Sequence, residues 1–475
     1  MAVVLCINVL FMANVSLVAK AQVHGARAWA VRIIQYNEVG MLLSVFTPSH
    51  NPQHLPALYK CLLNQTHTQW EWVIVANGID ATNVTTAVNT LTNKDPRVHC
   101  VRYQSSKIGD LKHFACRQAK GDVFVEVDHD DLITPDCLEE VAKAAQDRPH
   151  AFIYSDDVNL HEDGKCSTYT PAFGWKTYPC TMFDIPMTAH HTFKPTPRSL
   201  CEILFAPDHV RAWTRQAYDK AGGHDVSMDV ADDHELIVRT YLSGANFVHI
   251  PKSLYAHRMW NNQQNTSVAK VEKIQRISHQ TRDKHLYNLV EEWCRRENYV
   301  ILDMAMAEYS APKYLSVYKR GPADFVVDTV VDGFETISKQ LKDTGRKVGA
   351  IRAFNFLQSI PSASVHNWFN AAWKLLEPNG WLLTATPAIC DNDGRASKGA
   401  WQDPSNVSAW SNNNFWYITD NNYARFCPEV RCRFQAARNF VEYPSEFHRH
   451  NLIPYVYADL VALKGDMEIP GPVLI

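Results

Sequence analysis

"VFVEVDHDD", residues 123–131, is a β-branched apolar run that ends in three carboxylates, those of Asp128, Asp130 and Asp131. The apolar half predicts a buried strand that stops where the acids begin. Like charges at close range repel, and burying them is costly unless a positive group lies between them. The cluster is therefore either a solvated turn or helix cap, or a site for a divalent cation.

The residues that follow favour the cation. "TPDCLEEVAKAAQ", residues 134–146, predicts a helix with Thr134 as its N-cap and Pro135 at its first position, so the acids are not needed as caps. Asp128 and Asp130 are two positions apart and share one face of an extended backbone. Two such carboxylates suit Mg²⁺ or Mn²⁺ bound against a diphosphate.

The preceding residues alternate between strand and helix patterns. Strands are expected over 41–49, 70–78 and 97–104, and helices over 54–66 and 109–122. This alternation predicts an α/β fold with a doubly wound, parallel sheet. Because ligands bind at the carboxyl ends of such strands, the loops after Phe46, Val75 and Val127 should converge on one crevice that contains the acids.

Acidic residues also gather downstream. A helix is expected to begin near Asp229, and the five acids at its start exceed what a helix dipole requires: Asp225, Asp229, Asp232, Asp233 and Glu235. The preceding stretch 170–186, rich in Pro and aromatic residues, is expected to be loop. "FVHIPKSLYAHRMWNNQQNT", residues 247–266, predicts a last strand followed by a polar loop that carries His257.

Length and composition limit the function classes. A chain of 475 residues with 46% hydrophobic residues is too long for one core, which predicts two domains. A net charge of -3 without a basic block gives no footprint for nucleic acid. The 12 cysteines are irregularly spaced, as expected for reduced thiols in a cytoplasmic protein.

The apolar N-terminal stretch 1–21 has three open interpretations: a weak membrane anchor, a signal segment, or an extension outside the folded domain. No other stretch approaches the length of a spanning helix. We expect a cytoplasmic protein in which peripheral membrane association through this extension, residues 1–40, stays open.

The motifs along residues 41–270 resemble those of family-2 glycosyltransferases of the GT-A fold, which bind nucleotide-diphosphosugars. "FTPSHN" at 46–51 resembles the first-strand motif, and "VDHDD" at 127–131 the DxD motif. "YSDD" at 154–157 and "GG…DVADDHELIVR" at 222–239 follow in the family's order. The combination is far more specific than an acidic tripeptide alone.

The resemblance implies a role for each acid. Asp128 and Asp130 would face the metal and the donor diphosphate, with Asp131 supporting them in donor binding. Asp233 would be the catalytic base. His257, just after the last strand, would contact the metal or a phosphate, although a core or surface histidine is nearly as good an interpretation.

It also implies a donor pocket. Thr47 and Pro48 would line the nucleotide pocket, and Gly109 and Lys112 would lie at a helix N-terminus against the donor phosphates. One position departs from the family, which usually has acids at the end of the second strand where this chain has "IVANG". Asn77 can still pair with a nucleobase through its amide, so the identity of the base stays open.

The second half resembles a class I S-adenosylmethionine-dependent methyltransferase, a Rossmann-like α/β domain. The resemblance rests on "AWKLLEPNGWLLTATP", residues 372–387. The glycine-rich turn of that family is missing, since Ala305 and Ala307 stand in "LDMAMAEYS", and Tyr318 replaces the acid after the second strand. Asp303 remains. We expect S-adenosylmethionine not to bind, and this domain to pack against the transferase or to help hold an acceptor.

Four side chains of the second half could line a sugar groove, with aromatic core packing as the alternative: Trp401, Asp403, Trp410 and Trp416. The domains expected are residues 41–285, a GT-A glycosyltransferase, and 286–475, a degenerate methyltransferase-like domain.

The function expected from this resemblance is metal-dependent, inverting transfer of a sugar from a nucleotide-diphosphate donor to a glycan or lipid-linked acceptor. A bifunctional glycosyltransferase and methyltransferase, and a non-catalytic glycan-binding scaffold, are the alternatives.

Overall fold

The computed structural model describes residues 40–171, 174–203, 206–260, 269–305, 310, 313–318, 323–326 and 333–465. The chain divides into two units, Met1–Met41 and Leu42–Ile475, and the helices and strands below belong to the second. The predicted N-terminal extension lies, apart from its last residue, outside the described residues. Within the described ranges, no helix combines the length and apolar character needed to span a bilayer.

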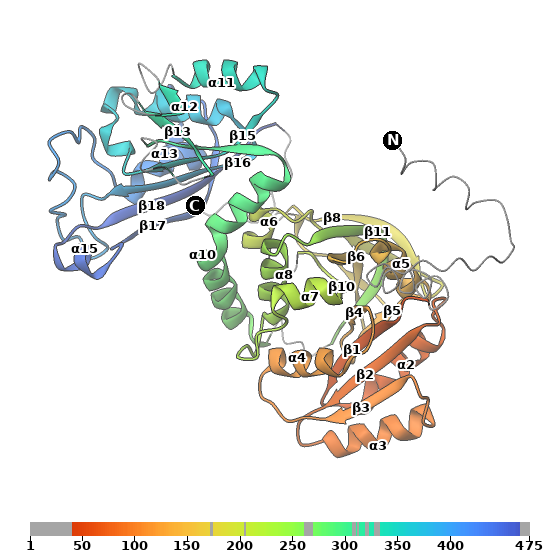
Figure 1. The fold of residues 1–475 in the computed structure, drawn as a ribbon. Helices are drawn as coiled ribbons and strands as arrows, with labels where there is room; N and C mark the ends of the chain where they lie inside the picture. Colours follow the sequence, from red (N-terminus) through yellow and green to blue (C-terminus); the bar gives the residue numbers. More distant parts are fainter. Residues whose placement is uncertain are drawn as a thin grey trace, which may run out of the picture. The chain divides into compact units, whose positions relative to one another are not determined.

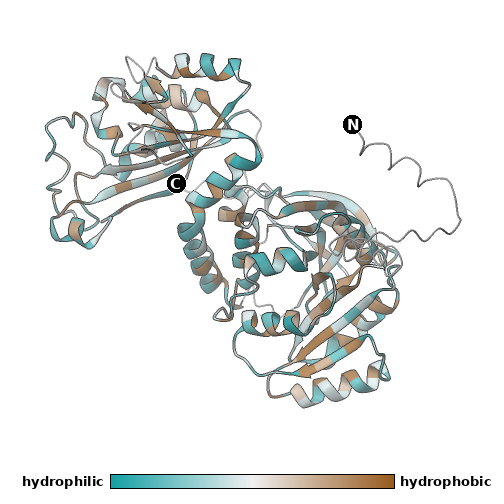
Figure 2. Ribbon diagram, in the orientation of Figure 1, coloured by the Kyte–Doolittle hydropathy of each residue, from teal (hydrophilic) through white to brown (hydrophobic). Residues whose placement is uncertain are grey.

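The first sheet begins with the four strands expected from the sequence (Figure 1). They pair in the parallel order β3-β2-β1-β4, with bounds β1 Leu43–Ser49, β2 Trp70–Ala76, β3 Val98–Arg102 and β4 Val123–Glu126. Every residue of β1 and β2 is buried, as expected for strands covered on both faces. The apolar colouring of these strands is visible in Figure 2.

The sheet continues as β10-β6-β11-β5, with bounds β10 Arg211–Thr214, β6 Ala151–His161, β11 Asn246–Met259 and β5 Leu132–Ile133. Strand β10 lies antiparallel between β4 and β6. The parallel pairing expected for the first four strands is confirmed, and β10, which the sequence did not predict, makes the whole sheet mixed. A four-residue strand is too short to show a periodicity in the sequence.

Helices cover the first sheet, and two predictions about this region need correction. The helices are α2 Leu55–Leu63, α3 Ala81–Thr92, α4 Ile108–Gln118, α5 Cys137–Ala145, α6 Pro197–Glu202, α7 Arg215–Ala221 and α8 Asp232–Leu242, with a 3₁₀ turn η1 at Pro52–His54. Helix α8 begins at Asp232, three residues after the predicted start. The predicted loop 170–186 contains most of a hairpin made of β8 Lys176–Met182 and β9 Ile185–His191. Strand β7, Cys166–Ser167, pairs with β6.

The N-terminus of α5 also differs from prediction. Asp136, not Thr134, is the N-cap, and the Thr134 hydroxyl donates to Asp136 Oδ1 at 2.7 Å. A turn closed by Cys137 N–H donating to Thr134 O precedes the helix. Because β5 separates the acid cluster from this cap, the cluster does not cap α5.

The second sheet follows α10, Val271–Arg296, and has the order β14-β13-β12-β15-β16-β18-β17. It is parallel up to β16, whereas β18 pairs antiparallel with both β16 and β17. Its strands are β12 Tyr299–Asp303, β13 Leu315–Tyr318, β14 Phe325–Val326, β15 Lys347–Phe354, β16 Leu376–Pro387, β17 Phe434–Glu442 and β18 Tyr455–Ala462.

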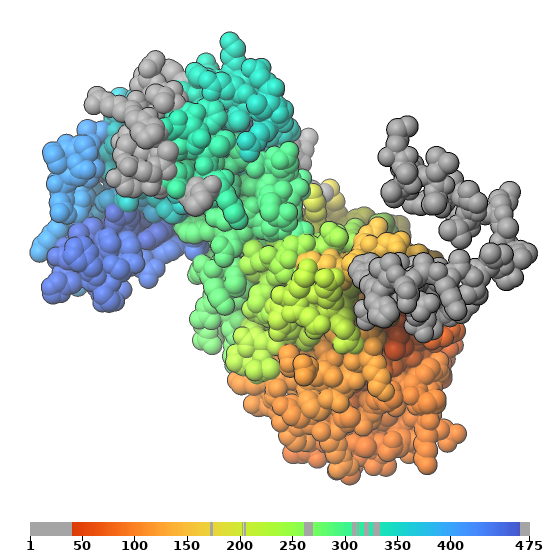
Figure 3. All heavy atoms as spheres, viewed as in Figure 1, coloured from red at the N-terminus to blue at the C-terminus, as the bar shows by residue number. Residues whose placement is uncertain are grey.

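Helices α11 Gly333–Asp343 and α12 Val365–Leu375 accompany this sheet, and the remaining short elements are η4 Leu357–Ser359, η5 Ser362–Ser364, η6 Asn412–Phe415, α13 Trp416–Thr419, α14 Asn421–Ala424 and α15 Glu446–His450. The domain boundary predicted at 285/286 falls inside α10. Buried α10 residues such as Leu289 and Trp293 share one core cluster with Trp213 of the first sheet and Trp381 of the second. Figure 3 shows α10, in green, beside the yellow-green segment that contains α8, and the two helices are in contact.

Candidate active site

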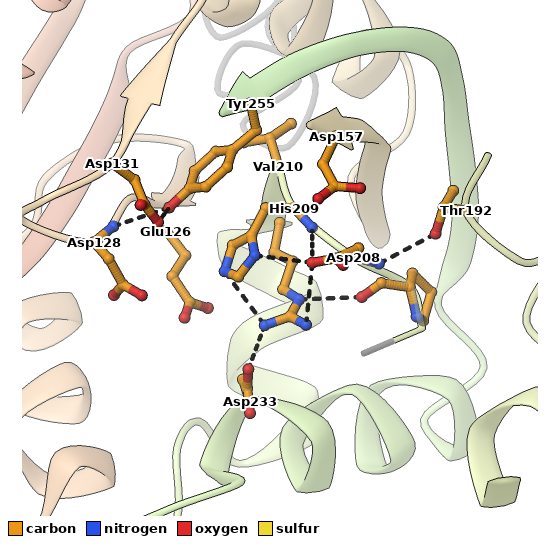
Figure 4. A network of polar contacts seen from close by, with 12 residues as sticks. Glu126, Asp128, Asp131, Asp157, Thr192, Asp208, His209, Val210, Asp233 and Tyr255 are labelled. Atoms are coloured by element: carbon orange, nitrogen blue, oxygen red, sulfur yellow. Dashed lines mark hydrogen bonds and ion pairs between the residues drawn. The ribbon is translucent and has the colours of Figure 1, made fainter. Parts of the chain in front are cut away.

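Asp131 anchors the acid cluster to β11 (Figure 4). Its carboxylate is buried and accepts two hydrogen bonds of 2.7 Å, one from the Tyr255 hydroxyl to Oδ2 and one from the Arg258 backbone N–H to Oδ1. The Tyr255 oxygen in turn accepts the Asp128 N–H at 3.2 Å. Asp131 thus ties the 128–131 loop to β11, and its predicted part in donor binding stays a prediction.

Burial raises the pKa of the Asp131 carboxyl to about 7, and the negative charges of Asp130 and Asp128 add to the shift, while His257 opposes it. Below the ordinary pKa of 3.8, the carboxyl is protonated in both folded and unfolded chains. Between that value and about 7, the unfolded chain ionises while the folded chain keeps its proton. The folded state then binds more protons, so this group makes stability fall as pH rises.

The Asp131→Asn variant should therefore become more stable relative to the unmodified chain as pH rises from about 4 to about 7. The amide cannot ionise, and its oxygen can still accept the Arg258 N–H. Urea unfolding at several pH values in EDTA measures the difference. Parallel stability curves for the two proteins would show that the carboxyl does not titrate in this range.

Asp128 and Asp130 have different surroundings. The Asp130 carboxylate accepts a hydrogen bond of 2.7 Å from Trp260 Nε1. The Asp128 carboxylate instead points to the same side as that of Glu126, away from Tyr255 (Figure 4). In the part of the chain that the structure describes, no three His, Cys, Asp or Glu side chains are grouped as a metal site. A cation here would need oxygens from a bound phosphate as well, which is the usual situation for Mg²⁺.

Lys112 is a buried residue close to these acids. Its Nζ is 2.5 Å from Glu126 Oε1 and 3.5 Å from Asp232 Oδ2. Burial opposes its charge, but Asp232 and Glu126 outweigh burial and hold the pKa of the ammonium well above its usual value. The second carboxylate oxygen of Glu126 is buried without a hydrogen-bond partner among the described residues. Lys112 is therefore a permanent cation, and it sits against carboxylates rather than exposed for a phosphate.

Gly109 packs against the 225–228 segment. Its N–H donates to Met228 O at 3.0 Å, and a Cβ at this position would lie 2.0 Å from Asp225 O. The start of α4 is thereby pressed onto the segment that leads into α8. This contact explains the glycine without a ligand.

Gly109→Ala should consequently lower the free energy of unfolding by roughly 1–3 kcal/mol, the usual cost of overpacking. Ser106→Ala, at an exposed position just before α4, should change it by less than about 0.5 kcal/mol. Denaturant titration measures both. An unchanged stability with weakened donor binding would instead assign Gly109 to the donor site.

Asp233 lies at the start of α8 and forms an ion pair with Arg211 of β10 (Figure 4). Its Oδ1 accepts the His234 N–H at 2.8 Å, and 27% of its side chain is exposed. Burial opposes the charge, but Arg211 and then Lys112 outweigh burial and hold the pKa of this carboxyl well below its usual range. Asp233 is thus ionised and accessible, as a proton acceptor must be, but its basicity is weakened by Arg211.

Arg211 was not found from the sequence. It is buried, and its Nε donates to Pro207 O at 3.1 Å, while Nη1 lies 3.4 Å from His209 Nε2. Asp208 Oδ1 is 4.0 Å from Nη2. An arginine opening an apolar four-residue strand, "RAWT", is the only signal that the sequence offered for it.

The side chains of Thr47 and Asn77 form hydrogen bonds with other residues of the fold. The Thr47 hydroxyl donates to Val127 O at 2.8 Å and accepts from Trp72 Nε1 at 2.9 Å, which joins β1 to β2 and to the residue that follows β4. The Asn77 amide donates to Ser105 O at 3.1 Å and accepts the Ser105 N–H at 3.2 Å. Pro48, next to Thr47, is buried in β1. These residues hold neighbouring segments of the first sheet together, and their part in nucleotide binding stays a prediction.

His257 lies among acids on β11. Burial opposes its charge, but Asp131, then Asp208 and Asp157, raise the pKa of the imidazole above its ordinary value. Asp157 on β6 is fully buried, and burial raises the pKa of its carboxyl to about 6. His257 therefore serves as a counter-charge to buried carboxylates, and only its neutral form could bind a metal.

The second sheet keeps Asp303, but not as a free acid. Its carboxylate forms an ion pair with Arg352 of β15, in which Arg352 Nε donates to Oδ1 at 3.0 Å. Ala307, which the sequence singled out, lies outside the described residues, and nothing is described of the Tyr318 side chain. Trp410 is a core residue whose Nε1 donates to Ser408 Oγ at 2.9 Å, whereas Trp401 is 60% exposed.

Comparison with known proteins finds similarities in the first part of the chain. Residues 44–205 match the model of Glycosyl transferase family 2. Hyaluronan synthase of Pasteurella multocida is 25% identical over 243 residues, which cover 50% of this chain and 22% of that protein. Chondroitin synthase of the same species is 25% identical over 219 residues, 45% of this chain and 20% of that protein. The similarity thus spans about a fifth of the length of these relatives.

A third curated relative, the O-antigen biosynthesis protein RfbC of Myxococcus xanthus, is 25% identical over 230 residues, 46% of this chain and 16% of that protein. Among solved structures, Staphylococcus aureus TarS 1-349 in complex with UDP-GlcNAc is 14% identical with a TM-score of 0.37, over 70% of this chain and 80% of that one. Mannosyltransferase PcManGT of Pyrobaculum calidifontis, in complex with GDP-Man and Mn²⁺, is 14% identical with a TM-score of 0.34, over 57% and 71%.

Proposed function

We propose that this chain, which carries a domain of glycosyl transferase family 2, transfers a sugar from a nucleotide-diphosphate donor to a glycan or lipid-linked acceptor. The observation that carries the proposal is the arrangement in Figure 4. There, the Asp128 carboxylate lies at the end of β4 and Asp233 at the start of α8, within one network of charged side chains. Acids at strand ends are where an α/β sheet binds its ligands.

A divalent cation, Mn²⁺ or Mg²⁺, would be held by Asp128, with Asp130 as the second candidate ligand. When bound, it would neutralise the charge that develops on the departing nucleotide diphosphate. Asp131 would contribute by fixing the loop that presents Asp128. His257 is a weaker candidate ligand, because the acids around it favour its protonated form.

Asp233 would act as the general base. The acceptor hydroxyl would lose its proton to the Asp233 carboxylate as its oxygen attacks the anomeric carbon, and the bond to the diphosphate would break on the opposite face, with inversion. Arg211 would keep the carboxylate ionised and oriented. Lys112 would balance the charge of Glu126 and Asp232, so the site need not be protonated to stay folded.

The acceptor is proposed from the relatives named above, which are a hyaluronan synthase, a chondroitin synthase and an O-antigen biosynthesis protein. A glycan, free or lipid-linked, is the acceptor class that these have in common by name. As part of the same proposal, the protein would act at the cytoplasmic side of a membrane, and its N-terminal segment would contact that membrane.

For the second sheet we propose a methyltransferase-type α/β domain that has lost the cofactor and supports acceptor binding. The parallel, doubly wound order of its central strands supports this fold, and the engagement of Asp303 by Arg352 argues against a free ribose-binding acid. Calorimetry of the full chain with S-adenosylmethionine separates this from a bifunctional enzyme, since measurable binding would favour the latter.

A screen of nucleotide sugars tests the main proposal. Thermal stabilisation and hydrolysis would be measured for UDP-, GDP-, CDP- and dTDP-sugars, each with and without Mn²⁺. We expect one nucleotide class to stabilise the chain in a metal-dependent manner. If none does, the non-catalytic glycan-binding scaffold becomes the better account.

A further inference from the structure

A cavity of about 770 Å³ lies beside β17, far along the chain from the acid cluster. A second cavity of about 400 Å³ shares Phe440 and Glu442 with it. We call the two together the β17 groove. Each of the two volumes is in the range of sites that bind small molecules. The argument below uses four of its lining residues: Trp416, Arg438, Asn439 and Phe440.

The groove follows the edge of the strand. Strand β17 is the last of its sheet, with β18 as its only neighbour in the described sheet. The five consecutive residues 436–440 all line the larger cavity. Since successive side chains of a strand point to opposite faces, a cavity that contacts all five lies along the strand's edge, where backbone N–H and C=O groups face outward.

The groove offers both flat apolar faces and polar groups. The rings of Trp416 and Phe440 are half-buried and form its apolar part. Asn439 Oδ1 is buried, and among the described residues it has no hydrogen-bond partner. Arg438 is held by Asp459 through hydrogen bonds of 2.7 Å from Nε and 2.6 Å from Nη2, which leaves Nη1 facing Asp283 Oδ1 at 3.6 Å.

An extended peptide fits this edge poorly. The pairing of β17 with β18 is interrupted between Ala436 and Arg438, which is a β-bulge. Bulges and inward-facing charges are the features by which sheet edges resist the addition of another strand. A ligand that makes scattered hydrogen bonds and lays flat faces on aromatic rings does not need a regular ladder.

We infer that the β17 groove binds a segment of the glycan acceptor, with sugar rings on Trp416 and Phe440 and hydroxyls on Asn439 and Arg438. Hydroxyl groups both donate and accept, so they can satisfy a carboxamide oxygen and a guanidinium together. The inference rests on the proposed function for its ligand class. It assigns the second half of the chain the task of retaining the acceptor.

Isothermal titration of the full chain with hexasaccharides of hyaluronan, chondroitin, chitin and cellulose, without donor or metal, tests the inference. We expect at least one to bind with a Kd of about 1 mM or tighter. Trp416→Ala and Asn439→Ala should each weaken that binding at least about tenfold, equivalent to 1.4 kcal/mol. Phe447→Ala, at an exposed phenylalanine of α15 outside the groove, should leave it unchanged. Thermal melting checks that each variant is folded.

Three results would overturn the inference: no hexasaccharide binds, the groove variants bind as well as the unmodified chain, or only an extended peptide of alternating Val and Thr binds. Donor binding is measured separately, with Asp128→Ala as its probe. If no hexasaccharide binds in the groove while the donor still binds, this inference alone is refuted. Groove binding without donor binding refutes the proposed transferase alone.

Discussion

Asp128→Ala is expected to lower the rate of sugar transfer at least about 10³-fold, a loss of roughly 4 kcal/mol of transition-state stabilisation. The variant would lose the carboxylate that points from the end of β4 into the site, and with it the proposed attachment of the cation. Added Mn²⁺ should not restore the rate. The measurement is donor turnover with a saturating acceptor, at several metal concentrations.

The matched control is Asp343→Ala, an exposed acid at the end of α11, which should keep full activity. Folding of the Asp128 variant should also be preserved, because the loop is anchored through Asp131 and through the backbone N–H of residue 128. Turnover within a factor of two of the unmodified chain, with an undiminished response to metal, would refute the assignment of Asp128.

Asp233→Asn is expected to lower kcat about 10²–10⁴-fold, the usual contribution of a positioned general base. The amide keeps the size of the side chain but cannot accept the acceptor's proton. Donor affinity should change little, because the donor contacts are assigned to other residues. Since Arg211 and Lys112 hold the pKa of Asp233 well below its usual range, we also expect no loss of rate from its protonation near neutral pH.

Asp229→Asn serves as the control for this variant. Asp229 lies just before α8 and pairs with Lys273, so its neutralisation tests whether any lost charge near α8 slows transfer. Equal losses in the two variants would mean that Asp233 acts through the local electrostatic balance rather than as the base.

The sequence predicted the elements that carry long, regular patterns. Strands β1 and β2 are buried along their whole length and helices α2 and α4 bury one side, so their apolar patterns are visible without any tertiary information. The placement of Asp128 at a strand end follows directly from the end of the apolar run. By contrast, β10 is only four residues long and antiparallel, and the hairpin of β8 and β9 contains two prolines. Neither element therefore has a recognisable strand pattern in the sequence.

Side-chain partners were the part that the sequence could not supply. The Lys112 ammonium could have faced a phosphate, but the fold brings Glu126 and Asp232 to it from two other elements. Asn77 could have read a base, but Ser105 lies within hydrogen-bond reach. The Arg211–Asp233 pair joins residues 22 positions apart through a strand that the sequence did not reveal. Such pairings depend on where the elements meet, which local patterns do not encode.

The most direct test of the account is a crystal structure of the chain soaked with Mn²⁺ and the nucleotide diphosphate that stabilises it most among UDP, GDP, CDP and dTDP. We predict an anomalous manganese peak in contact with the Asp128 carboxylate and with oxygens of both phosphates, at the ends of β1 and β4. A nucleotide bound elsewhere, or a metal bound without Asp128, would contradict it.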